Sequence, residues 1–329
     1  MKGYQTKFLS GINLRLPTLT TAQKKLRAAL KSDPKIFELR YTHFSIVMNK
    51  SRKFAFFAAT NIDGSKWNAE IKDRIAFTRD TNIADEFQVG DELYDFFKGK
   101  SANDFDKGHI AKFQDPQWGD ITTAKQAADE TMRFSNCVPQ HHSLNRGAWK
   151  SLEDYIVKGF TKNVGEDGRK VTVFAGPVLL NSDPFYIDLI DSKPLQIPCH
   201  FFKIVVYRNR SEKLTAVAFI MSQENILRKF NFVVDEKQDA RGVTVTKAIP
   251  EDDFFQTFKS GEPYQVRIDF VEKVTGFKFG LAAINQPYTK EESTEIIFKR
   301  VEVPISREAF GKLSLKDSPL SFKFEKIKL

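Results

Sequence analysis

One segment of this 329-residue chain gathers residue types that could hydrolyse a phosphodiester. It begins with Asp106-Lys107-Gly108-His109 and ends with Leu152-Glu153. A neutral imidazole such as that of His109 can accept a proton from water near neutral pH. A neutral oxygen ligand and a carboxylate can hold a hard cation such as Mg²⁺, directly or through water. Together these groups predict the metal-assisted attack of water on a phosphodiester.

The spacing of residues at the end of this segment is typical of a helix that packs one face on the core and lines a cleft with the edges of that face. Within the expected helix 144–157, Asn145, Trp149 and Leu152 are spaced by four and three positions and therefore share a face. Glu153 is rotated from Asn145 by about 80° around a regular helix. The helix can therefore bury Trp149 and Leu152 while it presents Asn145 and Glu153 to one cleft. The plainer alternative makes Asn145 a helix cap or a solvated residue, and the upstream histidine motif argues against it.

Taken in order, these motifs resemble those of the DNA/RNA non-specific endonucleases of ββα-metal fold, which include endonuclease G and the secreted Serratia nuclease. The family pattern has Asp-Arg-Gly-His, then Ser-Asn-x-x-Pro-Gln, then Leu-Asn-x-x-Ala-Trp-x-x-Leu-Glu. These positions are 106–109, 135–140 and 144–153 here. Landmarks in family order extend the resemblance over roughly residues 3–280, and they include Gly3-Tyr4, Asn61-Ile62-Asp63-Gly64, Asp115, Trp118-Gly119, Phe174-Ala175-Gly176-Pro177 and Phe201-Phe202-Lys203.

The resemblance implies a role for each candidate residue. His109 is the expected general base, although a lone histidine is more often a hydrogen-bonded core residue. Asn145 is the expected direct ligand of Mg²⁺, for which Mn²⁺ could substitute, and Glu153 is expected to hold waters bound to the metal. The other candidates are expected to orient the motif, support the site or contact phosphate, and they are Asp106, Asn136, Gln140, Lys107 and Arg146.

Two positions depart from the family pattern. Lys107 stands where the family usually has arginine. A lysine offers phosphate a single point charge in place of the two-pronged guanidinium of arginine. Val157 stands where some relatives carry a basic residue that holds phosphate. An arginine elsewhere could take over that contact, and the sequence does not choose among the three candidates Arg74, Arg79 and Arg133.

Zinc binding is the weaker interpretation of the histidines and cysteines. Cys137, His141, His142 and the pair Cys199-His200 fit no common zinc spacing, and the first three lie inside the nuclease motif. Two cysteines do not form a disulfide framework. We therefore expect both to be free buried thiols, which is typical of a reducing compartment.

The composition suits a polyanionic partner. A net charge of +9 and a pI near 9.3 favour contacts with phosphates, and 31 phenylalanines supply ample material for a core. The apolar runs are shorter than the roughly 18 residues of a membrane span. We recognise no secretory signal at the start of the sequence. The expectation is a cytoplasmic protein with DNA and RNA as partners and no membrane, and export by another route stays open.

Hydrophobic patterning predicts an α+β fold with a central, mostly antiparallel sheet flanked by helices. Strands are expected at 44–48, 54–59, 171–174, 185–190, 202–207 and 214–221, and helices at 22–31, 125–133 and 144–157. Residues 64–100 receive no assignment. From Tyr264 to Phe270 the alternation is typical of a strand, but the family resemblance implies a helix up to Gly276, and we adopt the helix.

We expect one endonuclease domain over residues 1–285. The tail, residues 286–329, alternates through Ile296, Phe298 and Val301 and ends at Phe322 and Phe324. It lies beyond the resemblance, and we expect a strand-rich extension packed on the same domain.

Three functions compete. The leading one is a Mg²⁺-dependent endonuclease that cuts DNA and RNA through phosphate contacts, and the family resemblance implies that it leaves 5′-phosphate ends. The second is a catalytically silent nucleic-acid-binding module, against which the presence of His109, Asn145 and Glu153 argues. The third is a phosphodiesterase restricted to small or modified substrates. A nuclease that stays in the cytosol must be restrained, so we also expect a triggered effector of bacterial antiviral defence, controlled by the tail, a homodimer contact or a regulatory partner.

Overall fold

The centre of the protein is a seven-stranded sheet in which every neighbouring pair is antiparallel. The computed structural model describes residues 2–68, 70–94, 105–154, 170–209, 211–248 and 258–288 and the short strands 298–302 and 320–324. In spatial order the sheet contains β1 (Leu39–Tyr41), β2 (Phe44–Asn49), β3 (Phe54–Asp63), β6 (Lys170–Val178), β8 (His200–Arg208), β9 (Leu214–Ser222) and β13 (Pro263–Val266). The expected α+β fold with an antiparallel sheet is confirmed.

The central strands are buried on both faces. All ten residues of β3 are buried, and β6, β8 and β9 are buried except at one end. Because successive side chains of a strand point to opposite faces, these strands contribute side chains to two separate hydrophobic cores, one on each face of the sheet. In β8, Phe201 and Val205 belong to one cluster, whereas Phe202 and Ile204 belong to the other.

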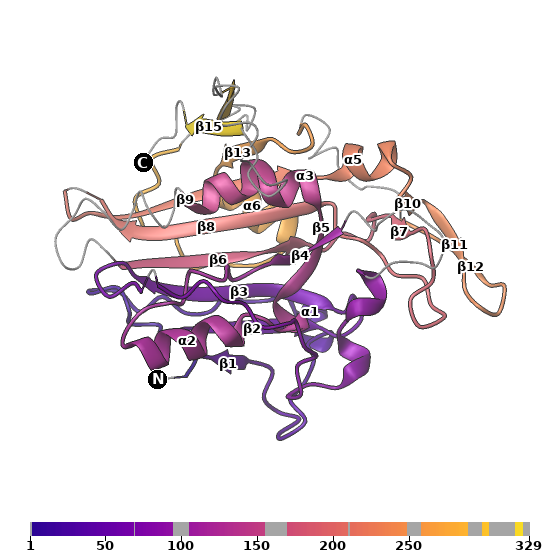
Figure 1. Cartoon of the computed structure of the whole chain (residues 1–329), viewed down its shortest axis with the longest axis horizontal. Helices are drawn as coiled ribbons and strands as arrows, with labels where there is room; N and C mark the ends of the chain where they lie inside the picture. Colours follow the sequence, from indigo (N-terminus) through magenta and orange to yellow (C-terminus); the bar gives the residue numbers. More distant parts are fainter. Residues whose placement is uncertain are drawn as a thin grey trace.

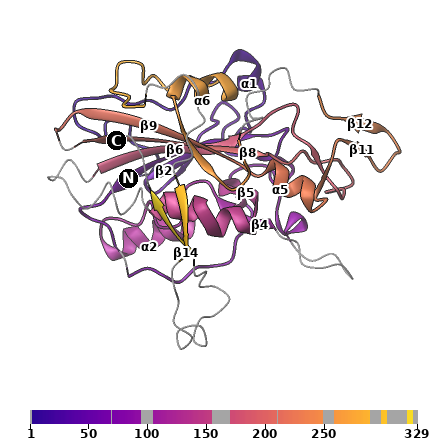
Figure 2. The same cartoon turned by 90° about the horizontal axis from the view of Figure 1, so that it is seen from above.

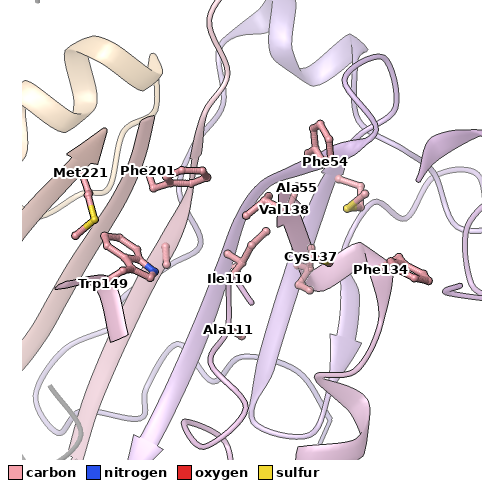
Figure 3. Packing of buried hydrophobic residues seen from close by; sticks show 14 of the residues in the cluster. Phe54, Ala55, Ile110, Ala111, Phe134, Cys137, Val138, Trp149, Phe201 and Met221 are labelled. Carbon is pink, nitrogen blue, oxygen red and sulfur yellow. The ribbon is translucent and has the colours of Figure 1, made fainter. Parts of the chain in front are cut away.

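Different parts of the chain cover the two faces (Figures 1 and 2). One face carries α2 (Ile121–Glu130), the helical segment 142–154 and a hairpin of β4 (Phe105–His109) and β5 (Cys137–His141). Figure 3 shows how this layer packs on the sheet, with Trp149 beside Phe201 and Met221. Over the other face lies α6 (Ile268–Thr275), which contacts α1 (Thr21–Lys25) through a hydrogen bond of 2.7 Å from Gln23 Nε2 to Thr275 O.

A smaller lobe extends from one end of the sheet. It contains α5 (Glu224–Lys229), the pair β7 (Phe185–Tyr186) and β10 (Val233–Val234), and the hairpin of β11 (Glu236–Gln238) and β12 (Thr244–Thr246). The hairpin projects away from the body in both views (Figures 1 and 2). Only the first two residues of the strand expected at 185–190 pair with β10, because the chain then turns through the bridge between Ile190 and Lys193.

The first helix is shorter than expected. Thr20 caps it, and Gln23 completes a reciprocal capping box, but the helix ends at Lys25. It buries none of its residues, and a short helix without a buried face has little to extend it. Beyond it, Ala28 N donates to Met48 O, so the chain follows the end of β2 instead.

Between residues 263 and 276 both sequence patterns hold in part. Tyr264 and Val266 belong to β13, which pairs with β9, so our assignment of a helix to them is wrong. The edge of the sheet offers these residues strand partners, and that pairing overrides the helix. From Ile268 to Thr275 the helix α6 is confirmed, and it ends at Gly276, whose φ of 73° is the left-handed conformation that favours glycine at a helix end.

The remaining assignments differ mainly at their ends. The hairpin of β2 and β3 is confirmed, and α2 starts earlier than expected because Asp120 caps it by accepting a hydrogen bond from Thr123 N. The unassigned stretch contains two short 3-10 helices, η1 (Asp85–Phe87) and η2 (Asp91–Leu93). In the tail, β14 (Phe298–Glu302) pairs with β15 (Leu320–Phe324), while Ile296 lies outside the described residues and the domain boundary at 285 stays a prediction. No helix in the described part of the chain is long and apolar enough to cross a membrane.

Candidate active site

His109 is presented by the β4–β5 hairpin, in which it lies opposite Cys137 while Asp106 lies opposite Gln140. The glycine of the motif has a steric reason. A Cβ on Gly108 would lie 2.3 Å from Gln140 Oε1, so the space that another side chain would need is already filled. Gln140 therefore packs directly beneath the strand that carries the histidine.

Asn136 is a support for this strand. Its fully buried amide donates to Ala111 O at 2.9 Å and to Thr131 O at 3.0 Å, and its oxygen accepts from Ala111 N at 2.8 Å. All three bonds go to backbone, two of them just beyond His109. The structure therefore places Asn136 as a residue that holds the chain in position, with no polar atom left over for a substrate.

Gln223, which is not among the residues predicted from sequence, connects the hairpin to the central sheet. Its buried side chain accepts from His141 N at 2.9 Å and donates to Pro139 O at 3.0 Å and to Pro198 O at 2.8 Å. Two of these partners are in β5, and the third precedes β8. A lone glutamine after a strand carries no sequence signal for such a role.

Asp106 joins the hairpin to the helical segment. Its Oδ2 accepts from Asn145 Nδ2 at 3.0 Å and from Arg146 Nε at 2.9 Å, and its Oδ1 accepts from a second nitrogen of Arg146 at 2.5 Å. The predicted phosphate contact Arg146 is thus engaged by a carboxylate. Because the nitrogen of the Asn145 amide is held by Asp106, its oxygen points the other way, and within the described residues no donor bonds it.

The helical segment is irregular at this junction. The expected regular helix is replaced by α3 (His142–Leu144) and a kinked stretch, η4 (Asn145–Trp149), with helix following to Asp154. Gly147 leaves helical geometry inside that stretch, at φ −97° and ψ −121°. Val157, one of the departures from the family pattern, lies outside the described residues.

Glu153 lies in a nearly buried group of charges. Its Oε1 accepts a hydrogen bond of 2.8 Å from Lys203 Nζ, and this lysine is only 1% exposed. Lys112 pairs with the neighbouring carboxylate of Asp154. Burial raises the pKa of Asp115 to about 6 against the opposing charges of Lys203 and Lys112. The sequence analysis names Lys203 as part of a family landmark and gives it no role. A lysine inside an apolar strand such as β8 nevertheless signals that its charge has a buried partner.

His109 is uncharged at physiological pH. Burial lowers its pKa to about 3, and the positive charges of Arg74 and Lys112 add to the effect. Its ring packs 4.9 Å from that of Phe77, and its Nε2 lies 3.3 Å from Met132 Sδ. A thioether only accepts, so this contact puts the ring proton on Nε2 and leaves the lone pair on Nδ1.

Of the three arginines considered as phosphate contacts, Arg74 is the one placed at the site. Its guanidinium lies 4.5 Å from the centroid of Phe113, next to the histidine ring, and its charge acts on both His109 and Glu153. Arg79 pairs with Glu92 at 2.7 Å, and the half-buried Arg133 donates to Thr78 Oγ1 at 2.6 Å.

Lys107 is turned toward a different set of groups. It pairs with Asp91, and its ammonium lies 5.4 Å from the ring centroid of Phe134 and 5.9 Å from that of Tyr94. As it stands, this predicted phosphate contact is neutralised by a protein carboxylate.

Comparison with known proteins identifies the family. Residues 27–283 match the DNA/RNA non-specific endonucleases. The chain belongs to this family. Among its relatives, the uncharacterised protein y4fB of Sinorhizobium fredii is 34% identical over 229 residues, which cover 68% of this chain and 33% of that protein. Nuclease C1 of Cunninghamella echinulata is 28% identical over 186 residues, or 53% of this chain and 67% of the relative.

The match to animal nucleases is also partial. Human mitochondrial nuclease EXOG is 25% identical over 196 residues, covering 56% of this chain and 49% of EXOG. The aligned part thus spans a third of the first relative and about half of the human one. A chain in a crystal structure of the EndoG/EndoGI complex is 20% identical with a TM-score of 0.49, covering 74% of this chain and 84% of that chain.

The donor set of this endonuclease-family site fits a hard cation that keeps most of its water. The free amide oxygen of Asn145 and the carboxylate of Glu153 are oxygen donors of the kind Mg²⁺ accepts. In the described part of the chain no three His, Cys, Asp or Glu side chains come together as a metal site. Cys137 and Cys199 are both free and buried, and Cys137 Sγ donates to Tyr94 Oη at 3.3 Å.

Proposed function

We propose that this protein is a metal-dependent endonuclease that hydrolyses DNA and RNA without selecting the sugar or the base. Family membership supports the reaction class. The observation that carries the proposal is the junction at Asp106, whose carboxylate binds Asn145 and Arg146 while its own strand carries His109. Arg74, whose charge acts on both His109 and Glu153, supports the proposal that the two halves of the sequence motif form one site.

In the proposed reaction, His109 Nδ1 removes a proton from water as the water oxygen bonds to phosphorus. The bond from phosphorus to the 3′ oxygen breaks, and that oxygen takes up a proton, leaving a 5′-phosphate and a 3′-hydroxyl. A histidine with a pKa near 3 is a weak base, but a bound phosphodiester brings negative charge that raises the pKa. Arg74, which packs on Phe113 beside the histidine ring, would bind that phosphate.

Mg²⁺, or Mn²⁺ in its place, would be held by Asn145 Oδ1 directly and by Glu153 through water, and it would neutralise charge on the phosphate and on the leaving oxygen. The protein's own part is to hold these two side chains at fixed places. Asp106 holds the amide of Asn145 at 3.0 Å, and Lys203 holds Glu153 at 2.8 Å.

A cleavage assay tests the proposal. Wild-type protein and His109→Ala are incubated with plasmid DNA and with RNA, with Mg²⁺ or with EDTA. We expect wild type to cut both nucleic acids only with the metal, and His109→Ala to lose about 10²–10⁴-fold in rate, the usual contribution of a general base, while it still retards DNA. His142→Ala is the matched control and should cut normally. Normal cutting by His109→Ala would sink the proposal.

The same assay decides between the competing functions. Retarded but intact DNA from the wild type would mean a silent binding module, and cleavage confined to dinucleotides would mean a narrower phosphodiesterase. We also propose that the activity is held back until a trigger arrives, as in a bacterial defence effector. Removal of residues 286–329 should then raise the rate, and strong cutting unchanged by that removal would contradict restraint by the tail.

A further inference from the structure

We infer that Lys203 is a positioning residue of the active site, which fixes the carboxylate of Glu153 relative to Asn145. The inference rests on the proposed function. It starts from the place of Lys203 in β8, where it is opposite Ala175 on one side and Phe219 on the other. Side chains alternate along the strand, so Lys203 points to the same face as Phe201 and Val205, the face that carries the hairpin and the helical segment.

Burial makes the partners of this lysine decisive. Its side chain is 1% exposed, and a buried ammonium is very costly without an opposite charge and hydrogen bonds. Lys203 Nζ donates to Glu153 Oε1 at 2.8 Å and lies 5.0 Å from the ring centroid of Trp149. The charge of Asp115 acts on it from a third element, the loop after β4.

The two residues that Lys203 touches are one helical turn apart. Trp149 ends the kinked stretch η4, and Glu153 follows four positions later on the same side of the helix that comes after the kink. Because Lys203 contacts both Trp149 and Glu153, it determines how this part of the helix is rotated about its axis. The helix alone cannot do so, because Gly147 interrupts its regular geometry between Asn145 and Glu153.

The site is therefore held from two ends. Asp106 holds Asn145 on the near side of the irregular turn, and Lys203 holds Glu153 on the far side. Glu153 uses Oε1 for the lysine, which leaves its second oxygen for waters on a metal. Asn145 and Glu153 can share the waters of one metal ion only if their side chains are held at a fixed distance from each other. Removal of a residue that holds a metal-binding side chain typically changes metal affinity or activity by about 10–100-fold.

Metal binding measured without catalysis is the main test. Mn²⁺ is titrated into wild type and Lys203→Met, and free Mn²⁺ is followed by electron paramagnetic resonance. We expect the dissociation constant to rise by about 10-fold or more in Lys203→Met, with DNA binding in EDTA unchanged. Arg52→Met is the matched control, because Arg52 makes a comparably buried pair with Asp183 at 2.7 Å whose partners lie outside the site. It should lose stability and keep its metal affinity.

A double-mutant cycle on the cleavage rate separates positioning from general structural damage. If Lys203 acts through Glu153, the double variant Glu153→Gln/Lys203→Met cuts no more slowly than Glu153→Gln alone. Additive losses would overturn the inference. If Lys203→Met does not fold, Lys203→Gln replaces it in every arm, because its amide is uncharged and one bond closer to the backbone than the ammonium, so it does not hold the carboxylate in the same place. Failure of both to fold while Arg52→Met folds would show that Lys203 serves the fold, and the inference would be abandoned.

The outcomes also distinguish this inference from the proposed function. A wild-type protein that neither binds Mn²⁺ nor cuts nucleic acid refutes the proposed function. A wild type that does both, together with a Lys203→Met variant of equal metal affinity, refutes only the role of Lys203.

Discussion

Asp106 Oδ2 accepts a hydrogen bond of 3.0 Å from Asn145 Nδ2, across 39 positions of the chain. This bond has a consequence for chemistry, since an amide whose nitrogen is held in place also has a fixed oxygen, which is the atom that can bind a metal. The carboxylate also holds Arg146 through two nitrogens. One acidic side chain thus sets the orientation of the expected metal ligand and takes up the charge of its neighbour.

Replacing Asp106 tests this arrangement. In Asp106→Ala the amide of Asn145 is free to rotate, and Arg146 loses its partner. We expect kcat to fall by about 10–100-fold with a higher Mg²⁺ requirement, as is usual for outer partners of a metal ligand. Initial rates of plasmid cleavage at several Mg²⁺ concentrations measure both effects. Asp239→Asn, which removes a pair with Arg241 on the projecting hairpin, is the control and should cut at the wild-type rate.

Arg74 should act on both substrate binding and the pKa of His109. Its positive charge lowers that pKa, so Arg74→Ala should raise it and shift the acid limb of the kcat/KM profile to higher pH. Loss of the phosphate contact should raise KM in the same variant. Arg133→Ala, which removes only a bond to Thr78, should change neither quantity. An unchanged acid limb in Arg74→Ala would argue against the placement of this arginine beside the histidine.

The residues of the motif could be predicted from sequence because short-range chemistry defines them. His109, Asn145 and Glu153 were all named from spacing and family resemblance, as were the strands whose apolar runs leave little choice. The residues that hold them were not. Lys203 acts across 50 positions and Gln223 across 82. A lysine inside an apolar strand signals that it has a buried partner but does not say which residue that is, and a lone glutamine gives no signal.

The errors have a common physical origin as well. The pattern 264–270 alternates like a strand, whereas the family resemblance implies a helix, and the pairing of Tyr264 with Ile220 decides where one ends and the other begins. The first helix is expected to continue beyond Lys25, but the chain leaves the helix there and forms a backbone hydrogen bond with the end of β2. In both places a partner distant in the sequence settled a local ambiguity, as tertiary context often does.

Asp115 should make stability depend on pH. Its folded pKa is about 6 against an ordinary 3.8, because burial disfavours the charged form. Between these two pKa values the folded state holds a proton that the unfolded state has lost. The free energy of unfolding therefore falls as the pH rises from about 4 to 6, and this contribution is constant at higher pH. The effect is about 3 kcal/mol at most, from roughly two pKa units.

Urea unfolding at pH 4, 6 and 8 measures this contribution against Asp115→Asn, which cannot ionise. The difference in free energy of unfolding between the variant and wild type should grow in favour of the variant from pH 4 to pH 6. A difference that stays flat over this range would mean that Asp115 is already ionised in the folded protein, with Lys203 and Lys112 compensating its burial.

Gly108→Ala should be destabilising because of one neighbour. The new Cβ would lie 2.3 Å from Gln140 Oε1, which is buried and has no hydrogen-bond partner among the described residues. Overpacking of this kind typically costs about 1–3 kcal/mol, and here it would also displace the strand that carries His109. Chemical denaturation and the cleavage rate should therefore both report a loss.

The double variant Gly108→Ala/Gln140→Ala identifies the cause. Shortening Gln140 removes the atoms that the Cβ meets, so much of the stability lost in Gly108→Ala should return. If the double variant is no more stable than Gly108→Ala alone, the glycine is required for its backbone and not for the space that Gln140 fills. Recovery of stability without recovery of cleavage would show in addition that Gln140 supports His109, as the sequence motif predicts.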